Sequence, residues 1–260
     1  MATAKTTKKT TKKATKKATT AKVPKPKTTT SAVKTPSAQA RGVITSEAMA
    51  FIAELATRQD REWYEPRKAD LKRLLQEPVL AVLRDVGAGL LDHFPAVEDA
   101  TPRVFRIHRD VRFAKDKSPY KDHVGGTLEL GGAVAYLHVD GNDVWAAVGV
   151  YEPSPAQLQA FRAAVGDTPT GPKLLQATVA LEARGYEVLS YDALSRAPAG
   201  WSPTHPCIRL LRLKGWALKL PALSVEARSD GSLGFAIAAH IVAAKDAIVL
   251  ADRAFSHRPG

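Results

Sequence analysis

The segment TLELGGAVAYLHVDGNDVWAAVGVY, residues 127–151, decides the fold class of this chain. It contains three runs rich in β-branched, aromatic and other apolar residues, at positions 127–130, 134–139 and 144–151. Gly131-Gly132 separates the first two runs, and the tetrapeptide Asp-Gly-Asn-Asp at 140–143 separates the last two. Both separators have hairpin turn composition, so the segment predicts an antiparallel meander of three strands.

Helical patterns flank this meander on both sides. Ser46 is a plausible N-cap for a first helix, and Ser154-Pro155 has the cap and first-position residues of another. Further helices are expected from Glu65-Pro66 to Leu75, from Pro78 to Leu90, over 172–183 and over 233–255, and further strands over 186–190 and 208–213. The pattern predicts a single α+β domain with a mainly antiparallel sheet flanked by helices.

The segment RIHRDVRFAKDKSPY, residues 106–120, carries the densest group of functional side chains. We expect a strand from Val104 to Phe113, so that alternate residues face opposite sides. One face would then carry apolar residues with Arg109 among them, and the other would carry Arg106, His108, Asp110 and Arg112. From 103 to 121 there are seven Lys or Arg and two Asp, a local balance of +5.

These side chains suit an anionic ligand. Five are the predicted anion-binding residues: Arg106, Arg109, Arg112, Lys115 and Lys117. Arg106 and Arg112 would lie about 20 Å apart at roughly 3.3 Å per residue, too far to share one phosphate. His108 and Asp110 are near enough to act as a proton-transfer pair, and Tyr120 adds a hydroxyl, so these three are the catalytic candidates.

A structural interpretation explains the same residues without a ligand. Arg109, if buried on the apolar face, needs a partner, because an unpaired buried charge costs several kcal/mol. Glu62, beside Trp63, is the candidate partner. An Arg-Asp-Glu network would then tie the strand to a helix.

The segment also carries a family resemblance. Its pattern R-x-x-R-D-x-R-F-x-x-x-K-x-P-Y resembles the signature of a widespread bacterial family of unknown function. Upstream, residues 55–64 and Lys68 resemble that family's Asn-Asn-x-x-Glu-Trp-Phe segment, with Arg58-Gln59 in place of the Asn pair. Residues 149–153 and His205-Pro206 are also similar to it. The resemblance covers roughly residues 44 to 256 and implies a compact mixed domain, with no activity attached.

Charge divides the chain into two parts. Residues 1–41 hold eleven Lys, one Arg and no acid, and the whole chain has a net charge of +12, so residues 42–260 are neutral. We therefore expect a disordered Lys/Thr/Ala-rich basic tail over 1–42, which lacks apolar residues to bury, and an α+β domain over 43–258. The tail resembles the lysine-rich tails of linker histones and bacterial histone-like proteins.

Unbroken positive charge binds polyanions by releasing counterions and reads no sequence. Nucleic acid is therefore the expected partner of the tail, and the expected location is the cytoplasm, in association with the nucleoid. The alternative is a solubilising extension without a specific role.

Several classes of protein are not expected. The single Cys207 excludes an internal disulfide and a multi-Cys zinc site, and the seven His are scattered, so we expect no metal and no cofactor. No run approaches the roughly 20 apolar residues that span a membrane, and the start has no secretory signal. Three functions stay open: an anion- or phosphate-binding protein, an enzyme acting on a phosphorylated or carboxylated small molecule, and a structural or interaction module.

Overall fold

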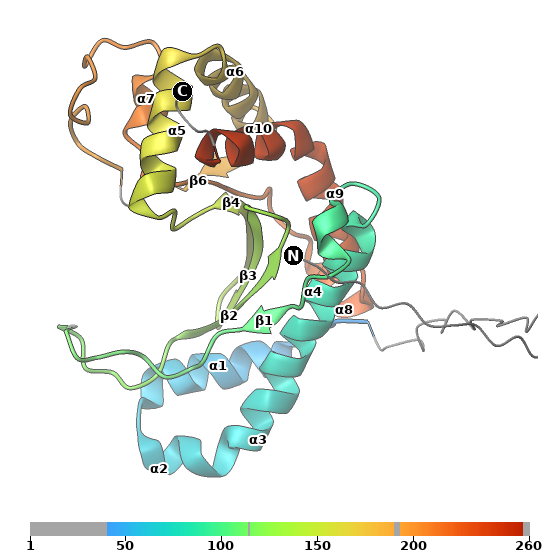
Figure 1. Cartoon of the computed structure of the whole chain (residues 1–260). Coiled ribbons are helices and arrows are strands. Elements are labelled where there is room, and N and C mark those ends of the chain that lie inside the picture. The colour runs from blue at the N-terminus through green and yellow to red at the C-terminus, as the bar shows by residue number, and fades with distance from the viewer. Residues whose placement is uncertain (1–40, 114, 190–192, 257–260) are drawn as a thin grey trace, which may run out of the picture. The chain divides into compact units, whose positions relative to one another are not determined.

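A computed structural model describes residues 41–113, 115–189 and 193–256 of the 260-residue chain (Figure 1). All of these residues belong to one compact unit. The predicted basic tail, residues 1–42, lies outside the described residues except for its last two.

Six strands of the described residues form one antiparallel sheet in the order β1-β2-β3-β4-β6-β5. Their bounds are Arg103–Val104 (β1), His123–Glu129 (β2), Val134–Asp140 (β3), Val144–Val150 (β4), Glu187–Val188 (β5) and Trp216–Lys219 (β6). The central three strands are the predicted meander, with the two predicted turns between them. The α+β fold with a mainly antiparallel sheet is confirmed.

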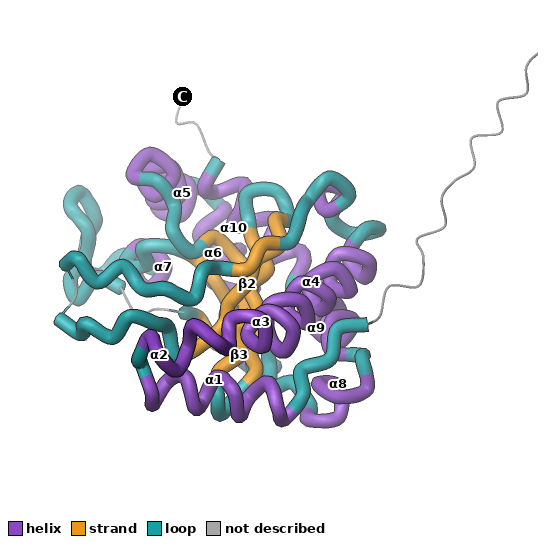
Figure 2. The backbone as a smooth tube through the Cα atoms, turned by 90° about the horizontal axis from the view of Figure 1, so that it is seen from below, coloured by secondary structure: helices purple, strands orange, loops and turns teal. Residues whose placement is uncertain are grey.

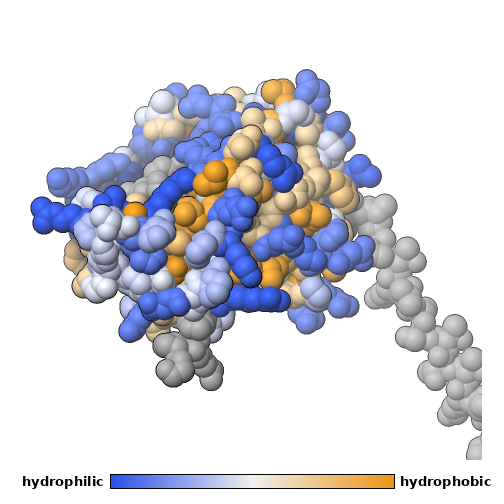
Figure 3. Space-filling view, turned by 90° about the horizontal axis from the view of Figure 1, so that it is seen from above, coloured by the Kyte–Doolittle hydropathy of each residue, from blue (hydrophilic) through white to orange (hydrophobic). Residues whose placement is uncertain are grey.

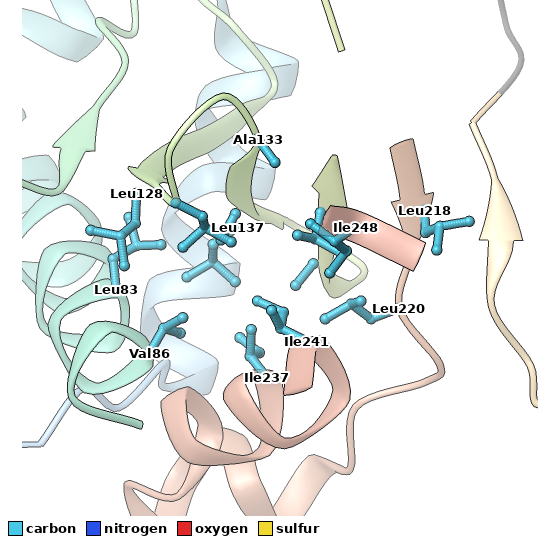
Figure 4. Close-up of a cluster of buried hydrophobic side chains, with 14 of the residues drawn as sticks. Leu83, Val86, Leu128, Ala133, Leu137, Leu218, Leu220, Ile237, Ile241 and Ile248 are labelled. Atoms are coloured by element: carbon cyan, nitrogen blue, oxygen red, sulfur yellow. The ribbon is translucent and has the colours of Figure 1, made fainter. Parts of the chain in front are cut away.

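One face of the sheet is buried under helices. On β3 the residues Ala135, Leu137 and Val139 alternate with half-buried ones, so every second side chain enters the core. Helix α4 (Glu77–Leu90) packs on β2, and α10 (Lys245–Phe255) packs on β4. Figure 4 shows side chains of both helices and of α9 (Leu233–Ala243) meeting the sheet residues.

The N-terminal helices form one bent run. Helix α1 (Ser46–Arg58) is followed by α2 (Arg61–Tyr64), a 3₁₀ turn (Glu65–Arg67), α3 (Lys68–Leu71), a π segment (Lys72–Gln76) and α4. Figure 2 shows the four α-helices of this run next to the strands of the sheet. The cap of α1 is Thr45, whose hydroxyl accepts from the amide of Ala48, and not Ser46 as predicted. Pro78 lies at the start of α4, where its missing N–H is tolerated directly after the wider π turn.

Two predictions for the C-terminal half are wrong. Residues 208–213, predicted as a strand, contain helix α7 (Ile208–Leu211), and the strand of this region is β6. The predicted helix over 233–255 is broken at Ala244 into α9 and α10, which are bent by 68°. Apolar runs of this length do not distinguish a buried strand from a buried helix, which explains the first error.

The remaining helices are α5 (Pro155–Asp167), α6 (Thr170–Glu182), α8 (Val225–Asp230) and a short 3₁₀ turn (Pro95–Val97). The Ser154-Pro155 start of α5 is confirmed, with a reciprocal capping box between Ser154 and Gln157. Helices α5 and α6 pack on α10, which completes the helical layer at the β4 end of the sheet.

Among the described helices none is long and apolar enough to cross a membrane by itself; α9 and α10 reach that length only as a sharply bent pair. On the face shown in Figure 3, hydrophobic residues reach the surface in several places between hydrophilic ones. Scattered exposure of this kind is ordinary for a folded domain. Two of the exposed large side chains, Phe105 and Tyr151, share a cavity that is described below.

Candidate functional site

Residues 105–121, the motif arm, leave the sheet between β1 and β2 (Figure 1). The predicted strand from Val104 to Phe113 is wrong, because regular pairing ends at Val104. The arm then pairs with itself: the amide of Arg109 donates to Pro119 O at 2.9 Å, and the amide of Lys121 donates to Ile107 O at 2.8 Å. The described part of the arm past Arg109 has no strand partner, so its side chains do not alternate across a sheet.

The charges of the motif arm pair with one another. Arg112 grips the Asp110 carboxylate with two nitrogens, Nε at 2.9 Å from Oδ1 and Nη2 at 2.6 Å from Oδ2. Arg109 pairs with Asp116. The prediction that Glu62 is the partner of Arg109 is therefore wrong, and Glu62 is exposed. The acid that Arg109 needs comes from the returning half of the same arm.

Asp116 is the acid with the most perturbed titration in the arm. Hydrogen bonds from the Ser118 hydroxyl and amide, together with Arg109, lower its pKa to about 2. Lys117 donates to the carbonyl of Val111 at 2.8 Å. Lys115 is exposed, and so is Phe113, at 95%. The predicted anion-binding residues of the arm are thus mostly bound to its own carboxylates and carbonyls.

Aromatic side chains anchor the base of the arm. Tyr120 is buried against Tyr64 of α2, with ring centroids 4.4 Å apart, and His108 packs edge-on against both rings. Burial is the largest cause that raises the pKa of Tyr120. The Tyr120 amide donates to Gln59 Oε1 at 3.1 Å, and Gln59 is a non-glycine residue with φ +49°. Among the described residues no hydrogen bond joins His108 to Asp110, so these catalytic candidates do not act as a pair in this geometry.

Trp63, the other predicted structural residue, is buried in α2. Its indole Nε1 donates to Glu54 Oε1 at 3.0 Å, and the Arg67 guanidinium lies over its ring at 4.7 Å. Helix α2 contacts the motif arm through the ring of Tyr64, which packs on Tyr120 and His108, and Gln59 adds a hydrogen bond to the arm. These contacts take the place of the predicted Arg-Asp-Glu network.

The face of the sheet opposite the helical core holds a cavity of about 540 Å³. Its walls combine aromatic and polar side chains: Phe105, Lys121, His123, Thr127, Tyr136, Trp145, Tyr151, Glu152 and Gln157. A volume of this size is within the range of roughly 300–1,000 Å³ that small-molecule sites occupy. Strands β2, β3 and β4 supply the floor, because their alternate residues must face away from the core.

A chain of hydrogen bonds runs along β3 on this open face. Tyr136 Oη lies 3.0 Å from His138 Nδ1, and His138 Nε2 lies 3.1 Å from Asp140 Oδ2. Residues two apart on a strand share a face, so the spacing Y-x-H-x-D brings the three groups into line. The ring of His138 is stacked between Trp145 at 4.6 Å and His123 at 4.4 Å.

Burial and neighbouring charges perturb this chain. Burial raises the pKa of Tyr136 to about 12, with a further contribution from Tyr151. Burial also lowers the pKa of His138, as does His123, against the opposing pull of Asp140. For Asp140 burial acts upward, but the amides of Asn142 and Asp143 and the His138 ring outweigh it and lower the pKa. At neutral pH the chain therefore consists of a phenol, a neutral imidazole and a carboxylate.

Lys121 lines the cavity, and a second lysine, Lys219, lies near it but outside the lining. Lys121 is half-buried at the foot of the motif arm, with Nζ 5.3 Å from the centre of the Phe105 ring. Burial lowers its pKa, and the positive charge of Arg106 lowers it further. Within the described part of the chain, no carboxylate forms an ion pair with Lys121. Lys219 of β6 lies over the ring of Trp145 at 5.3 Å.

Several residues of this site were not singled out from the sequence. The signal was present in VAYLHVD, residues 134–140, where Tyr, His and Asp alternate with Ala, Leu and Val. Polar residues on the outer face of such a strand are ordinary by themselves. The distinguishing feature is that these three side chains can form hydrogen bonds with one another, but the cavity that Tyr136 lines depends on elements far apart in the sequence.

Comparison with protein families matches residues 47–244 to a family described as conserved hypothetical protein (DUF2461). The chain belongs to this family. The expectation of membership in an uncharacterised family is confirmed, and the match includes every strand of the sheet and the motif arm. No curated protein and no solved structure matches the chain. In the described ranges no group of three or more His, Cys, Asp or Glu side chains is arranged to hold a metal ion.

Proposed function

We propose that the domain binds a small anion with a planar ring, such as a nucleotide, in the cavity on the open sheet face. Lys121 carries this proposal. It is a half-buried cation next to a second cation, Arg106, and its pKa is lowered by both burial and repulsion. An anion at this end of the cavity would remove that repulsion and gain charge-assisted hydrogen bonds.

The ring of the ligand is inferred from the walls. Phe105, Tyr136, Trp145 and Tyr151 line the cavity, and aromatic walls favour aromatic ligands through offset and edge contacts. Glu152 stands in the same lining and disfavours a second anionic group beside it. The preferred ligand therefore has one acidic group, held near Lys121, and a ring that extends across the sheet.

Binding of adenosine monophosphate, adenosine and inorganic phosphate by the full chain tests the proposal. We expect the monophosphate to bind more tightly than either part, since only it engages both the cation and the aromatic walls. Replacing Lys121 by Gln should weaken its binding by about 10- to 100-fold, the loss of one charge-assisted hydrogen bond at roughly 1.5–3 kcal/mol.

Lys115→Gln is the matched control, because it removes the same charge from an exposed position in the motif arm. It should leave binding unchanged. If Lys115→Gln weakens binding and Lys121→Gln does not, the arm and not the cavity holds the anion. Equal binding of phosphate alone would remove the argument for a ring.

A second function, nonspecific binding of nucleic acid, rests on the charge of residues 1–41. Eleven Lys and one Arg stand there without an acid, whereas the rest of the chain is neutral. We propose that this segment binds the phosphate backbone and holds the protein at the nucleoid. Replacing the Lys pairs at 8/9, 12/13 and 16/17 by Gln in the full chain should flatten the dependence of log K on log salt by about 0.9 per lost contact with duplex DNA. An unchanged slope would show that these six lysines make no contact with the DNA phosphates and would contradict the proposal for them.

A further inference from the structure

We propose that Tyr136, His138 and Asp140 form a proton relay that makes the cavity a site of acid–base catalysis, with the Tyr136 oxygen as the group that contacts the bound molecule. The inference rests on the proposed function, since it concerns the same cavity. It assigns this site a reaction step: removal of a proton from a hydroxyl group, or a water molecule, that lies against Tyr136.

The direction of the hydrogen bonds follows from the charge state of each group. Asp140 is an ionised acceptor, because two backbone amides already donate to it, so His138 Nε2 must carry a proton and donate to Oδ2. His138 is neutral, so its Nδ1 has a lone pair and accepts the Tyr136 hydroxyl proton. The lone pairs of the Tyr136 oxygen are then left for the cavity that this residue lines.

The relay has a balanced proton transfer. A hydroxyl of the bound molecule gives its proton to the Tyr136 oxygen, and the original Tyr136 proton passes to His138 Nδ1. The bound molecule becomes an alkoxide and His138 becomes an imidazolium, next to the Asp140 carboxylate that stabilises it. Tyr136 does not have to ionise before the transfer. This is consistent with its pKa, which burial raises to about 12.

Two further rings, those of His123 and Trp145, stack on His138 without forming hydrogen bonds to its ring nitrogens. His123 of β2 stacks on its ring, and Asp122 forms a hydrogen bond of 2.8 Å with His123 Nδ1. Trp145 of β4 covers the opposite side and cannot titrate. Among the described residues, Tyr136 and Asp140 alone form hydrogen bonds with the ring nitrogens of His138. His123 is therefore a neighbour that changes the local charge without belonging to the relay.

Acetylation by p-nitrophenyl acetate tests the relay without a known substrate. In this reaction the Tyr136 oxygen attacks the acyl carbon, its proton passes to His138 and nitrophenolate leaves. Release of nitrophenolate gives the total rate of acyl transfer to the chain, and peptide mass spectrometry at successive times gives the rate at each tyrosine. Tyr151 is an internal reference, because it lines the same cavity and is 53% exposed.

We expect Tyr136 to be acetylated faster than Tyr151, although Tyr151 is the more accessible. His138→Gln should slow acetylation of Tyr136 by about 10²-fold, the lower end of what a positioned general base contributes. Asp140 is a positioning residue: Asp140→Asn keeps an oxygen for the turn amides but turns an amide N–H toward His138 Nε2, reverses the tautomer and should slow the reaction as well. The matched control His93→Gln removes an imidazole that does not line the cavity, and it should leave the rate nearly unchanged.

The dependence of the acetylation rate on pH distinguishes a base from a residue that only supports the fold. In the wild-type protein the acetylation rate at Tyr136 should fall as acid protonates His138, and this fall should be absent in His138→Gln. Thermal unfolding establishes that each variant is folded at the assay temperature. Faster acetylation of Tyr151 than of Tyr136, or equal rates at Tyr136 with and without His138, would overturn the relay. Neither result depends on whether adenosine monophosphate binds, so the two proposals fail separately.

Discussion

The motif arm and the open sheet face carry similar side chains, but these side chains differ in their exposure and in the groups that they contact. In the arm, Arg109 and Arg112 are neutralised by acids of the same arm, and these groups are largely exposed. On the sheet, Tyr136 and His138 are held half-buried by neighbours on other strands, and Tyr136 lines a cavity. Of the motif arm, therefore, only the two end residues Phe105 and Lys121 reach the cavity, whereas its Arg-Asp pairs lie elsewhere.

The difference has a physical cause. An exposed ion pair gains little, because water and salt screen it, whereas a half-buried group keeps its orientation and its perturbed pKa. The arm is held at its base by the buried rings of Tyr64 and Tyr120 and not by its charges. Four predictions test this division between arm and sheet, ordered from the largest effect to the smallest.

Tyr120→Ala should lower the free energy of unfolding by roughly 3–5 kcal/mol, as the loss of a buried aromatic ring does. Tyr120 is only 3% exposed and packs on Tyr64 and His108. Phe113→Ala, an aromatic truncation at an exposed position in the same arm, should have almost no effect. Urea unfolding measures both. Equal losses would mean that the arm is held along its whole length.

Leu137→Ala should destabilise the domain by roughly 2–5 kcal/mol, because Leu137 is fully buried on the helical side of β3. Its neighbour Tyr136 points to the open face, and Tyr136→Phe removes only a hydroxyl there. That variant should unfold close to the wild-type denaturant concentration. A large loss of stability in Tyr136→Phe would show that the hydroxyl supports the fold.

Acid should destabilise the domain through His138. Its pKa in the folded protein is lowered from 6.5, first by burial and then by His123. The unfolded chain therefore binds the proton more readily, so stability falls as pH drops below about 6.5 and levels off beneath the folded value.

His138→Gln removes this contribution, so its stability should depend less on pH between about pH 7 and pH 5. His123→Gln should raise the pKa of His138, because His123 is one of the groups that lower it. Denaturant unfolding at each pH measures the first effect and histidine NMR titration measures the second. Parallel stability curves for wild type and His138→Gln would contradict the assignment.

Arg112→Ala should leave the melting temperature and the binding of adenosine monophosphate unchanged. Its carboxylate partner Asp110 is exposed, and the pair closes within the arm. Differential scanning fluorimetry with and without the nucleotide tests both statements. Weaker binding with an unchanged melting temperature would instead place the anion on the arm, as the sequence pattern suggests.

Local patterns predicted the sheet and much of the helical layer. The turns at Gly131-Gly132 and at 140–143, and the cap at Ser154, depend on short-range chemistry that no tertiary contact overrides. The strand from Val104 to Phe113 failed because alternation does not supply a pairing partner. Residues 208–213 failed because their apolar run suits either a strand or a helix when both are buried.

The site residues were also predicted only in part. The sequence identified Arg109 as a group that needs a partner, but it named Glu62 where the returning half of the arm supplies Asp116. It passed over Tyr136, His138 and Asp140, which are separated only by apolar residues. Sequence distance hid the cavity, because Lys121, Trp145 and Gln157 come from three different parts of the chain.

The sequence by itself determined the α+β class, the antiparallel meander, the family and the separation of a polycationic segment from a neutral remainder, because each depends on composition or on residues close together in the chain. Only the tertiary structure decided which charges neutralise one another and which side chains enclose a cavity. Ion pairing and cavity formation depend on distances between segments, and those distances arise only when the helices bury one face of the sheet and leave the other open.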